Sequence, residues 1–430
     1  MPGSVRSRCV LAAALVLALA APAASARQPT FAHTITIVLE NRGVADIVGN
    51  PHAPFINGTL MTQDAYATNL YVTTHNSPTA YYILVSGLTF EKGDGGSWAG
   101  SCATATAACS TDATSLLAQT RAAGRIWKVY SEDQETPCQT TFVKKYWPNH
   151  NPAIFFRGLG PSPYWPTGDS SCAQWDVPAS ELPTDIANGT LPDLVYLIPS
   201  NCHNMHDSCA PTSDPIAQGD AWLQRVLAGD QVVAGGLAAW AQAHDTLILI
   251  TFDEATAADK QFCCPYAATG GGGHVPLWVI GPPDKVRGGG FHDDGFMNLF
   301  PLFKQLEENW SYPLLGHAAD TDVGDLSAFL IDQPTGPALT LTPTAGSAQQ
   351  PVHVAVSGFA PNEHVDVLWG CGSDGCAAAT PVASGVADAV GDLAADVLPP
   401  ARAAAGATLI GAVGASSGTV ATASYTLVTG

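Results

Sequence analysis

Between residue 34 and about residue 318, short apolar runs alternate with longer helical or loop segments. Continuous runs of Val, Ile and Leu are typical of strands that are buried on both faces, as in parallel sheets covered by helices. The alternation therefore predicts an α/β domain with a mostly parallel sheet flanked by helices. Strands are expected at 35–39, 126–130, 194–198, 247–252 and 275–280, and helices at 115–123, 222–228 and 233–243.

Polar side chains lie at the ends of these predicted strands. Glu40-Asn41 and Asp253-Glu254 directly follow two of them, His206-Asp207 come shortly after a third, and His274 precedes a fourth. Open α/β sheets place their binding sites at the carboxyl ends of parallel strands. The sequence therefore predicts that these acidic and histidine side chains meet at one edge of the sheet.

Ser77 opens an apolar stretch, rich in small residues, that stops at Gly87. This pattern predicts a helix with a glycine C-cap, with Ser77 at or near the N-cap and Pro78 at the first helical position. The unpaired N–H groups and the positive end of the helix dipole favour a bound phosphate, and an oxygen that attacks it. The alternative is that Ser77 only caps the helix.

With these residues, the chain resembles the secreted phosphoesterase family that contains bacterial acid phosphatases and phospholipases C, within the alkaline phosphatase superfamily. The resemblance spans roughly residues 31 to 330 and follows the family's order through Glu40-Asn41, Ser77 to Gly87, Trp127 to Tyr130, His150-Asn151-Pro152, His206-Asp207, Gly219 to Leu223, Asp253-Glu254 and His274-Val275-Pro276. It implies an alkaline phosphatase-like α/β fold and a phosphoric ester hydrolase, with an acid phosphatase favoured over a phospholipase C or another phosphodiesterase.

The resemblance also implies roles for individual residues. Glu40, Asn41, Asp253 and Glu254 would bind one divalent cation of unknown identity, which their hard oxygen donors suit. Ser77 would be the nucleophile and a further ligand, because a metal-bound hydroxyl has a lowered pKa. The resulting reaction would pass through a phosphoseryl intermediate.

Three histidines have implied roles as well. His206, beside Asp207, and His150 are expected to contact the phosphate or to protonate the leaving oxygen. The alternative for each is a loop histidine bonded to a backbone carbonyl. His274 is expected to be a metal ligand or to contact an oxyanion.

The chain departs from the family pattern at three places. Thr79-Ala80 stand where the family has Pro and Asn, and Arg42-Gly43 stand where it has His and Ser. Asn204 occupies a position where a carboxylate is expected, which favours one cation over two. A weakly active secreted protein that binds or adheres is the alternative from another functional class.

The formal charge of −20 argues against nucleic acid or an anionic membrane as a partner held by bulk electrostatics. Affinity for an anion must therefore be local, from a metal, helix N-termini or histidines. The expected partner is a small-molecule or lipid phosphate ester, and the sequence leaves the oligomeric state open.

The first 26 residues are expected to be a secretory signal peptide. Arg6 and Arg8 precede an apolar run from Cys9 to Ala20, and Ala24-Ser25-Ala26 fits the cleavage rule. A membrane anchor is the alternative, but the run is short for a span, and no later stretch reaches about 18 apolar residues. The protein is therefore expected to be extracellular, with no integral membrane segment.

Eleven cysteines, of which Cys9 lies in the expected signal peptide, predict disulfide bonds in an exported chain. Zinc binding is less favoured, because the chain has no Cys-x-x-Cys pair. Local spacing suggests Cys102–Cys109, Cys202–Cys209 and Cys371–Cys376, and leaves Cys138, Cys172, Cys263 and Cys264 to pair.

The composition changes after Asp332. Residues 335–430 are rich in Thr, Val, Ala and Gly, almost lack Lys and Arg, and show alternating strands at 338–342, 352–356, 364–369 and 423–428. Such strands with Gly and Pro turns predict a β-sandwich, which resembles the immunoglobulin-like modules of secreted bacterial proteins. We therefore expect a catalytic domain at 27–332 and a spacer or adhesion module at 333–430.

Overall fold

The computed structural model describes residues 28–89, 111–156, 159, 171–261, 271–332, 337–372, 375–388 and 391–428. These residues divide into two compact units, one from Gln28 to Asp332 and one beginning at Gln333. Within the described ranges, no helix is both long and apolar enough to cross a membrane.

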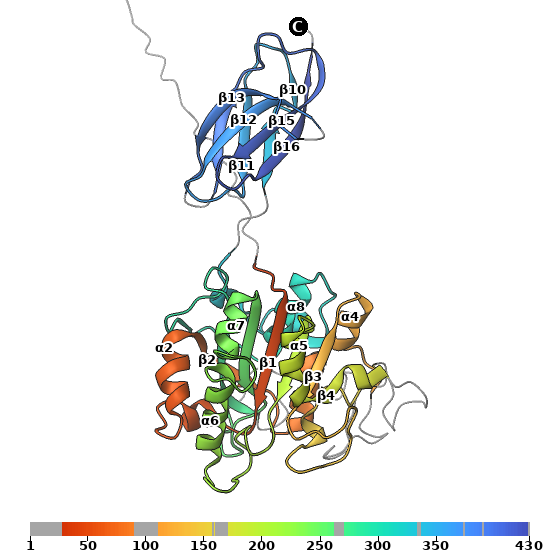
Figure 1. Ribbon diagram of the computed structural model, residues 1–430, viewed down its shortest axis with the longest axis vertical. Coiled ribbons are helices and arrows are strands. Elements are labelled where there is room, and N and C mark those ends of the chain that lie inside the picture. The colour runs from red at the N-terminus through yellow and green to blue at the C-terminus, as the bar shows by residue number, and fades with distance from the viewer. Residues whose placement is uncertain are drawn as a thin grey trace, which may run out of the picture. The chain divides into compact units, whose positions relative to one another are not determined.

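The first unit contains a sheet whose described strands run in the order β4-β3-β5-β1-β6-β7-β2-β8 (Figure 1). The five strands from β4 to β6 are parallel, whereas β7 is antiparallel to both β6 and β2. The mostly parallel sheet expected from the sequence is therefore confirmed. The bounds are β1 His33–Leu39, β2 Ala65–Val72, β3 Trp127–Ser131, β4 Asp176–Pro178, β5 Leu194–Ile198, β6 Thr246–Phe252, β7 Gly273–Ile280 and β8 His292–Asp293.

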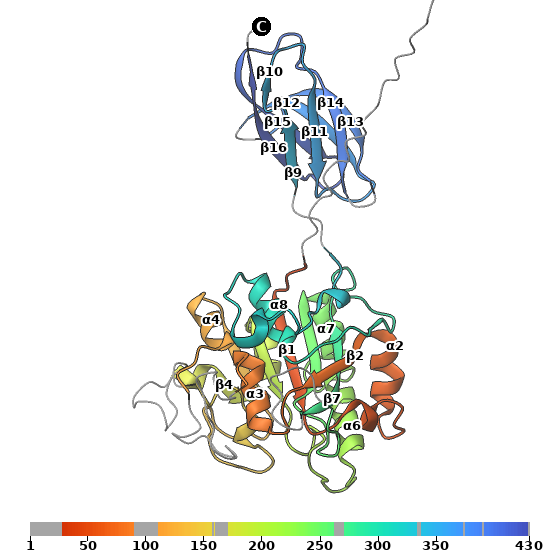
Figure 2. The same cartoon turned by 180° about the vertical axis from the view of Figure 1, so that it is seen from behind.

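Helices cover both faces of this sheet. Helix α6 packs against α7, whereas α3 packs against α4 and α8, and views from opposite sides place these two groups on opposite faces (Figures 1 and 2). The described α-helices are α1 Val44–Ile47, α2 Met61–Gln63, α3 Ser77–Ser86, α4 Leu116–Ala122, α5 Leu182–Ala187, α6 Pro215–Leu227, α7 Leu237–Ala243 and α8 Pro301–Asn309. The other helical segments are a π-helix, η1 Ile56–Leu60, and the 3₁₀ turns η3 Pro148–His150, η5 Ser171–Gln174, η6 Ala179–Glu181, η7 Gly316–Ala319 and η8 Ser327–Phe329.

Two helices differ from their expected bounds. Helix α6 begins earlier, at Pro215, because the Asp214 carboxylate accepts hydrogen bonds from the first-turn N–H groups and caps it there. Helix α7 begins later, at Leu237, because Gly235-Gly236 adopt positive φ directly before it. Strand β2 was not expected, because Ala65 and Ala67 fill buried positions and Thr68-Asn69 interrupt its apolar residues.

The start of α3 is one residue away from the prediction. Asn76 is the N-cap, because its side-chain oxygen accepts a hydrogen bond from the Thr79 N–H, so Ser77 takes the first helical position and Pro78 the second. The predicted glycine C-cap is confirmed: Gly87 has a φ of 68° and donates its N–H to the Ile83 carbonyl. Ser77 therefore lies at the N-terminal end of α3, and every residue from Ala80 to Ser86 is buried.

The second unit is the expected β-sandwich. Its described strands form a five-stranded sheet, β10-β16-β15-β12-β13, and a three-stranded sheet, β14-β11-β9. Inward-facing side chains of both sheets, among them Val354, Val367, Ile410 and Tyr425, form a core of its own. The bounds are β9 Ala338–Thr342, β10 Ala345–Gly346, β11 Val352–Ser357, β12 His364–Cys371, β13 Thr380–Val386, β14 Leu393–Val397, β15 Gly406–Gly414 and β16 Val420–Leu427.

Three disulfides are present in the described residues. Cys202–Cys209 and Cys371–Cys376 are two of the predicted pairs. Cys138–Cys172 joins two of the four cysteines whose partners the sequence left open. The predicted pair Cys102–Cys109, and Cys263 with Cys264, lie outside the described residues.

Candidate active site

The central strands bring two acidic residues together. Strands β1 and β6 are parallel, with Leu39 paired with Phe252, so Glu40 and Asp253 leave the sheet side by side. The Asp253 N–H donates to the Leu39 carbonyl (2.9 Å), and both carboxylates are fully buried. The register of a parallel ladder therefore places the predicted acidic pair at one point, as expected for the carboxyl edge of an α/β sheet.

Asn41 turns the chain away from this point. It has a φ of 56°, a left-handed conformation that Asn tolerates better than most residues. Its backbone N–H donates to Asp253 Oδ1 (3.2 Å), and its side-chain amide lies 3.5 Å from Glu40 Oε2. Asn41 thus links the ends of β1 and β6 and directs an amide oxygen or nitrogen toward the acidic pair.

Ser77 lies between two of the carboxylates. Its Oγ is 2.9 Å from Glu254 Oε1 and 3.2 Å from Glu40 Oε2. A hydroxyl has a single hydrogen to donate, so it cannot satisfy both acceptors at once. The helix start and the ends of β1 and β6 therefore bring together Glu40, Ser77, Asp253 and Glu254, the arrangement that the sequence predicted.

Burial makes this cluster costly to charge. It raises the pKa of Glu40 to about 8, raises that of Glu254, and raises that of Asp253 well above its usual range. Repulsion from the neighbouring carboxylates adds to the effect on Glu40 and Asp253. No N–H or O–H group of the described residues donates to Asp253 Oδ2, which is buried. Three crowded acids with an unsatisfied oxygen are stabilised by a bound positive charge.

The donor chemistry of the cluster fits a hard divalent cation, because oxygen atoms supply it. Among the described residues, no three His, Cys, Asp or Glu side chains alone form a group able to hold a metal ion. A cation here would therefore also need oxygens from Asn41 and Ser77, which border the same carboxylates.

His150 reaches the cluster from η3. It is buried, its Nδ1 lies 3.5 Å from Glu40 Oε1, and its ring contacts both Tyr81 of α3 and Trp147. Burial and the nearby His206 lower the pKa of His150 to about 3. His150 is therefore a neutral imidazole, which can donate or accept a hydrogen bond but carries no proton to transfer at neutral pH.

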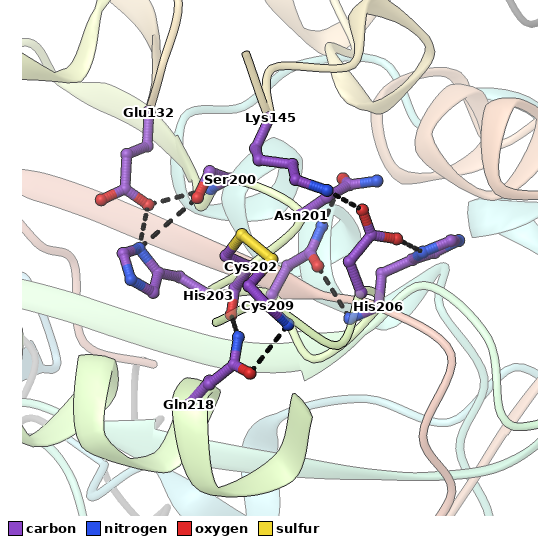
Figure 3. Close-up of a disulfide and its surroundings, with 11 residues drawn as sticks. Glu132, Lys145, Ser200, Asn201, Cys202, His203, His206, Cys209 and Gln218 are labelled. Atoms are coloured by element: carbon purple, nitrogen blue, oxygen red, sulfur yellow. Dashed lines mark hydrogen bonds and ion pairs between the residues drawn. A yellow bond between two sulfur atoms is a disulfide. The ribbon is translucent and has the colours of Figure 1, made fainter. Parts of the chain in front are cut away.

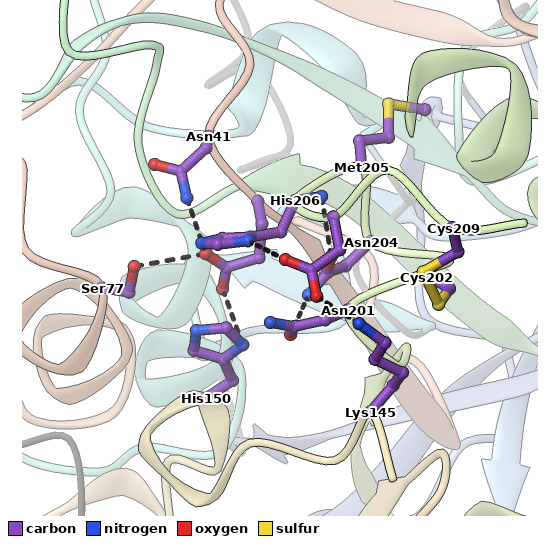
Figure 4. Close-up of polar contacts among 12 residues, drawn as sticks. Asn41, Ser77, Lys145, His150, Asn201, Cys202, Asn204, Met205, His206 and Cys209 are labelled. Atoms are coloured by element: carbon purple, nitrogen blue, oxygen red, sulfur yellow. Dashed lines mark hydrogen bonds and ion pairs between the residues drawn. A yellow bond between two sulfur atoms is a disulfide. The ribbon is translucent and has the colours of Figure 1, made fainter. Parts of the chain in front are cut away.

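His206 has different surroundings, although the two imidazole centres are only 6.1 Å apart. Its Nδ1 is 2.7 Å from Asp207 Oδ1, and Lys145 Nζ donates to Asp207 Oδ2 (2.8 Å; Figure 4). Burial opposes ionisation of Asp207, but the hydrogen bonds from Lys145 and His206 outweigh it and lower the pKa of this carboxyl. Because Asp207 is an acceptor, Nδ1 of His206 carries a hydrogen and Nε2 is left for a substrate.

The loop that carries His206 is fastened at both ends. The Cys202–Cys209 disulfide closes it, and the Gln218 amide of α6 donates to the Cys202 carbonyl (2.9 Å) and accepts from the Cys209 N–H (3.0 Å; Figure 3). Glu132 of the neighbouring segment accepts hydrogen bonds from the Ser200 N–H, just before the ring, and from His203 within it. His206 is thus held by covalent and polar contacts on both sides.

Asn204, which stands in place of the expected carboxylate, has a structural role in this loop. Its side-chain oxygen accepts from the His206 N–H (2.9 Å), and its amide donates to Asn201 Oδ1 (3.1 Å). Its backbone carbonyl accepts from the Glu40 N–H (2.7 Å). Asn204 therefore connects the His206 loop to the end of β1.

His274 lies differently from the other predicted residues. Its Nε2 donates to the Thr68 carbonyl (2.7 Å), and its ring stacks on Tyr71. A carbonyl only accepts, so Nε2 holds the hydrogen and only Nδ1 is left to bind a metal. None of its described hydrogen bonds reaches the carboxylate cluster.

Sequence reasoning missed three residues of this site. His75 places Nδ1 3.1 Å from Glu254 Oε2 and donates from Nε2 to the Asp259 carbonyl (2.7 Å), so it orients the carboxylate that contacts Ser77. Its position two residues before Ser77 was the available signal. Lys145 and Trp147 come from a loop with no sequence pattern of its own, and only the fold brings them to His206.

The chain matches known families in both of its units. A phosphoesterase family model matches residues 57–311, and a macroglobulin-like domain model matches residues 336–427. Phosphatidylinositol-3-phosphatase of Mycobacterium tuberculosis is 29% identical over 298 residues, which cover 69% of this chain and 83% of that protein.

Similar solved structures include a protein in the alkaline phosphatase superfamily from Vibrio parahaemolyticus and the phosphonate monoester hydrolase of Agrobacterium radiobacter. The first has 12% identity and a TM-score of 0.42, covering 77% of this chain and 78% of that chain. The second has 14% identity and a TM-score of 0.37, covering 69% and 77%. Because the phosphoesterase match spans more than half of the 430 residues, the chain belongs to the phosphoesterase family, whose members hydrolyse phosphoric esters.

Proposed function

We propose that this protein is a phosphomonoesterase of the acid phosphatase type, with Ser77 as its nucleophile. The observation that carries the proposal is the position of Ser77 Oγ, between Glu40 and Glu254 at the start of a helix. A hydroxyl at a helix start has N–H groups beside it that can bind phosphate oxygens. The similarity to a phosphatidylinositol-3-phosphatase supports a monoester as the substrate class.

Glu40, Asn41, Ser77, Asp253 and Glu254 would hold one divalent cation. When bound, the cation would neutralise the carboxylates and the phosphate oxygens and would lower the pKa of the Ser77 hydroxyl. Support comes from the raised pKa values of the three acids and from the unsatisfied Asp253 oxygen.

The chain's own residues supply the remaining steps. Ser77 Oγ attacks phosphorus while its proton passes along its hydrogen bond to Glu254 Oε1. The bond from phosphorus to the ester oxygen breaks, and the alcohol leaves with a proton from His206 Nε2. Water then attacks the phosphoserine, His206 takes the water proton, and the Ser77 oxygen leaves with the proton returned by Glu254.

His206 and His150 have different roles in the proposed reaction, because their surroundings differ. His206, held by an ionised Asp207, is the proton donor. His150 is a neutral contact to a phosphate oxygen. Export of the protein is part of the proposal, supported by the disulfides Cys138–Cys172 and Cys202–Cys209.

The experiment compares wild-type and Ser77→Ala protein on p-nitrophenyl phosphate and on bis(p-nitrophenyl) phosphate, with metal analysis of the purified chain. We expect faster hydrolysis of the monoester, about one divalent cation per chain, and a kcat lowered by roughly three orders of magnitude in Ser77→Ala. A preference for the diester would instead support a phosphodiesterase or phospholipase C. Hydrolysis of neither ester would overturn the proposal.

A further inference from the structure

Two aromatic side chains lie beside the histidines of the site, and the reaction described above does not use them. The Trp147 ring is 5.2 Å from that of His206 and 5.7 Å from that of His150. Phe142 lies edge-on to Trp147 at 5.5 Å, and 45% of its surface is exposed. We call this pair the aromatic shelf; it extends from the two histidines to solvent.

The shelf is held in place by the loop that carries it. Val143 and Tyr146 pair through backbone hydrogen bonds, and the Tyr146 hydroxyl donates to the Gln139 carbonyl (2.7 Å). Lys144, between them, adopts a left-handed φ of 47°, which a non-glycine residue keeps only where its surroundings enforce it. These contacts define the conformation of the loop from which Phe142 extends into solvent.

The same loop is fastened to the active site. The Lys145 carbonyl accepts from the Asn201 N–H (3.0 Å), and Lys145 Nζ binds Asp207. Lys144 pairs with Glu135. Since both lysines already face carboxylates, the shelf offers an apolar surface and no spare cation for a second phosphate group.

Aromatic faces carry partial negative charge and give no favourable contact to a phosphate anion. The shelf must therefore face another part of the ester. In phosphoryl transfer the leaving oxygen lies opposite the attacking oxygen, and here it lies toward the acid His206 and so toward Trp147. We propose that Phe142 and Trp147 form the leaving-group subsite and select monoesters whose alcohol is apolar, through an aromatic ring or an alkyl chain.

The inference rests on the proposed function and is tested with a matched series of esters. Wild type and Phe142→Ser are compared on 1-naphthyl phosphate, octyl phosphate and glycerol 2-phosphate, with inorganic phosphate as an inhibitor. Ile126→Ser is the control, because Ile126 is also exposed (48%) but directly precedes β3, at the amino-terminal end of that strand, whereas the site lies at the carboxyl ends of the strands. Comparing the naphthyl and octyl esters distinguishes a ring from a chain as the preferred group.

We expect Phe142→Ser to raise KM for the apolar esters about threefold to tenfold, as for the loss of one aromatic contact. The kcat/KM for glycerol 2-phosphate and the inhibition by phosphate should stay within about twofold of wild type, and Ile126→Ser should change neither ester class. Trp147→Phe, which keeps a ring, should weaken the apolar preference without abolishing turnover. An equal effect of Phe142→Ser on apolar and polar esters would overturn the subsite.

Binding separates this inference from the proposed function. Calorimetry on Ser77→Ala, with and without Phe142→Ser, compares 1-naphthyl phosphate with inorganic phosphate in the absence of turnover. Tighter binding of the naphthyl ester that depends on Phe142 supports the shelf even if the wild type hydrolyses no monoester. Equal affinity for both ligands would overturn the shelf even in an active enzyme.

Discussion

Ser77 depends on its neighbours for any reactivity, because a serine hydroxyl with its ordinary pKa is a weak nucleophile. Asn76 caps the helix and leaves Ser77 at the first helical position. The carboxylates of Glu40 and Glu254 lie within hydrogen-bond distance of its hydroxyl. His75 in turn orients Glu254. At the scale of single residues, the site is therefore a series of polar contacts in which each side chain sets the orientation of the next.

Lys145 belongs to a second series of contacts, through Asp207 to His206, and its function is easily separated from folding. It is half-exposed, and it holds Asp207, which orients His206. Lys145→Met should lower kcat about tenfold for an alkyl phosphate, whose leaving oxygen needs a proton, and much less for p-nitrophenyl phosphate. Steady-state kinetics on both esters measure the difference. Lys144→Met, which removes only the contact with Glu135, is the control, and equal losses on the two esters would refute a role through His206.

Asp176 makes stability depend on pH. It is fully buried in β4, and burial raises its pKa from 3.8 to about 7, although hydrogen bonds from Asn151 and Gln134 oppose the shift. Between about pH 4 and pH 7 the folded chain keeps this proton while the unfolded chain has lost it. The free energy of unfolding therefore falls as pH rises through this window, by about 4 kcal/mol at most from this group.

Asp176→Asn should remove that dependence, because an amide keeps an oxygen for Asn151 and Gln134 but does not ionise. Urea unfolding at pH 4.5 and pH 7.5 gives the test. We expect the variant to gain stability relative to wild type at the higher pH. A difference between variant and wild type that is the same at both pH values would contradict the assignment.

At the scale of elements, the sequence was most informative where strands are buried on both faces. The apolar runs of β1, β5 and β6 are short and uninterrupted, which favours strands, and the acidic residues after β1 and β6 lie side by side because those strands are parallel and adjacent. Strand β2 has no such run, because it lies near the edge of the sheet and its buried residues alternate with half-exposed ones.

The loops were not predictable in the same way. The segment that carries Lys145, Trp147 and His150 has no periodicity, and its course is set by contacts with residues distant in sequence, such as Asp207 and Asp176. Those contacts exist only once the fold has formed. The sequence could therefore propose His150 only through the family resemblance, and it gave no sign of Lys145 or Trp147.

The Cys202–Cys209 ring is predicted to matter for catalysis more than its stability effect suggests. A disulfide closing so short a loop stabilises by about 2 kcal/mol, yet this one also fixes the segment that carries His206. The double variant Cys202→Ser/Cys209→Ser should fold and lose about tenfold or more in kcat. The matched control is Cys371→Ser/Cys376→Ser in the second unit, which should lose stability of that unit without loss of kcat. Equal kcat values for the two double variants would contradict the prediction.

At the scale of the whole molecule, the chain consists of two units with separate cores, and all of the proposed site residues lie in the first. A chain ending at Asp332 should therefore keep its kcat on a soluble ester within about twofold of the full-length value. Circular dichroism verifies that the shortened chain is folded. A folded but inactive product would mean that the second unit completes the site.

The central claim is that Ser77 carries the phosphoryl group during turnover. The most direct measurement is an acid quench of the wild-type enzyme during hydrolysis of a phosphorus-labelled monoester, followed by digestion and sequencing of the labelled peptide. The label is predicted on Ser77, and Ser77→Ala should retain none. A label on Thr73 or Thr74, or an unimpaired Ser77→Ala enzyme, would contradict the account.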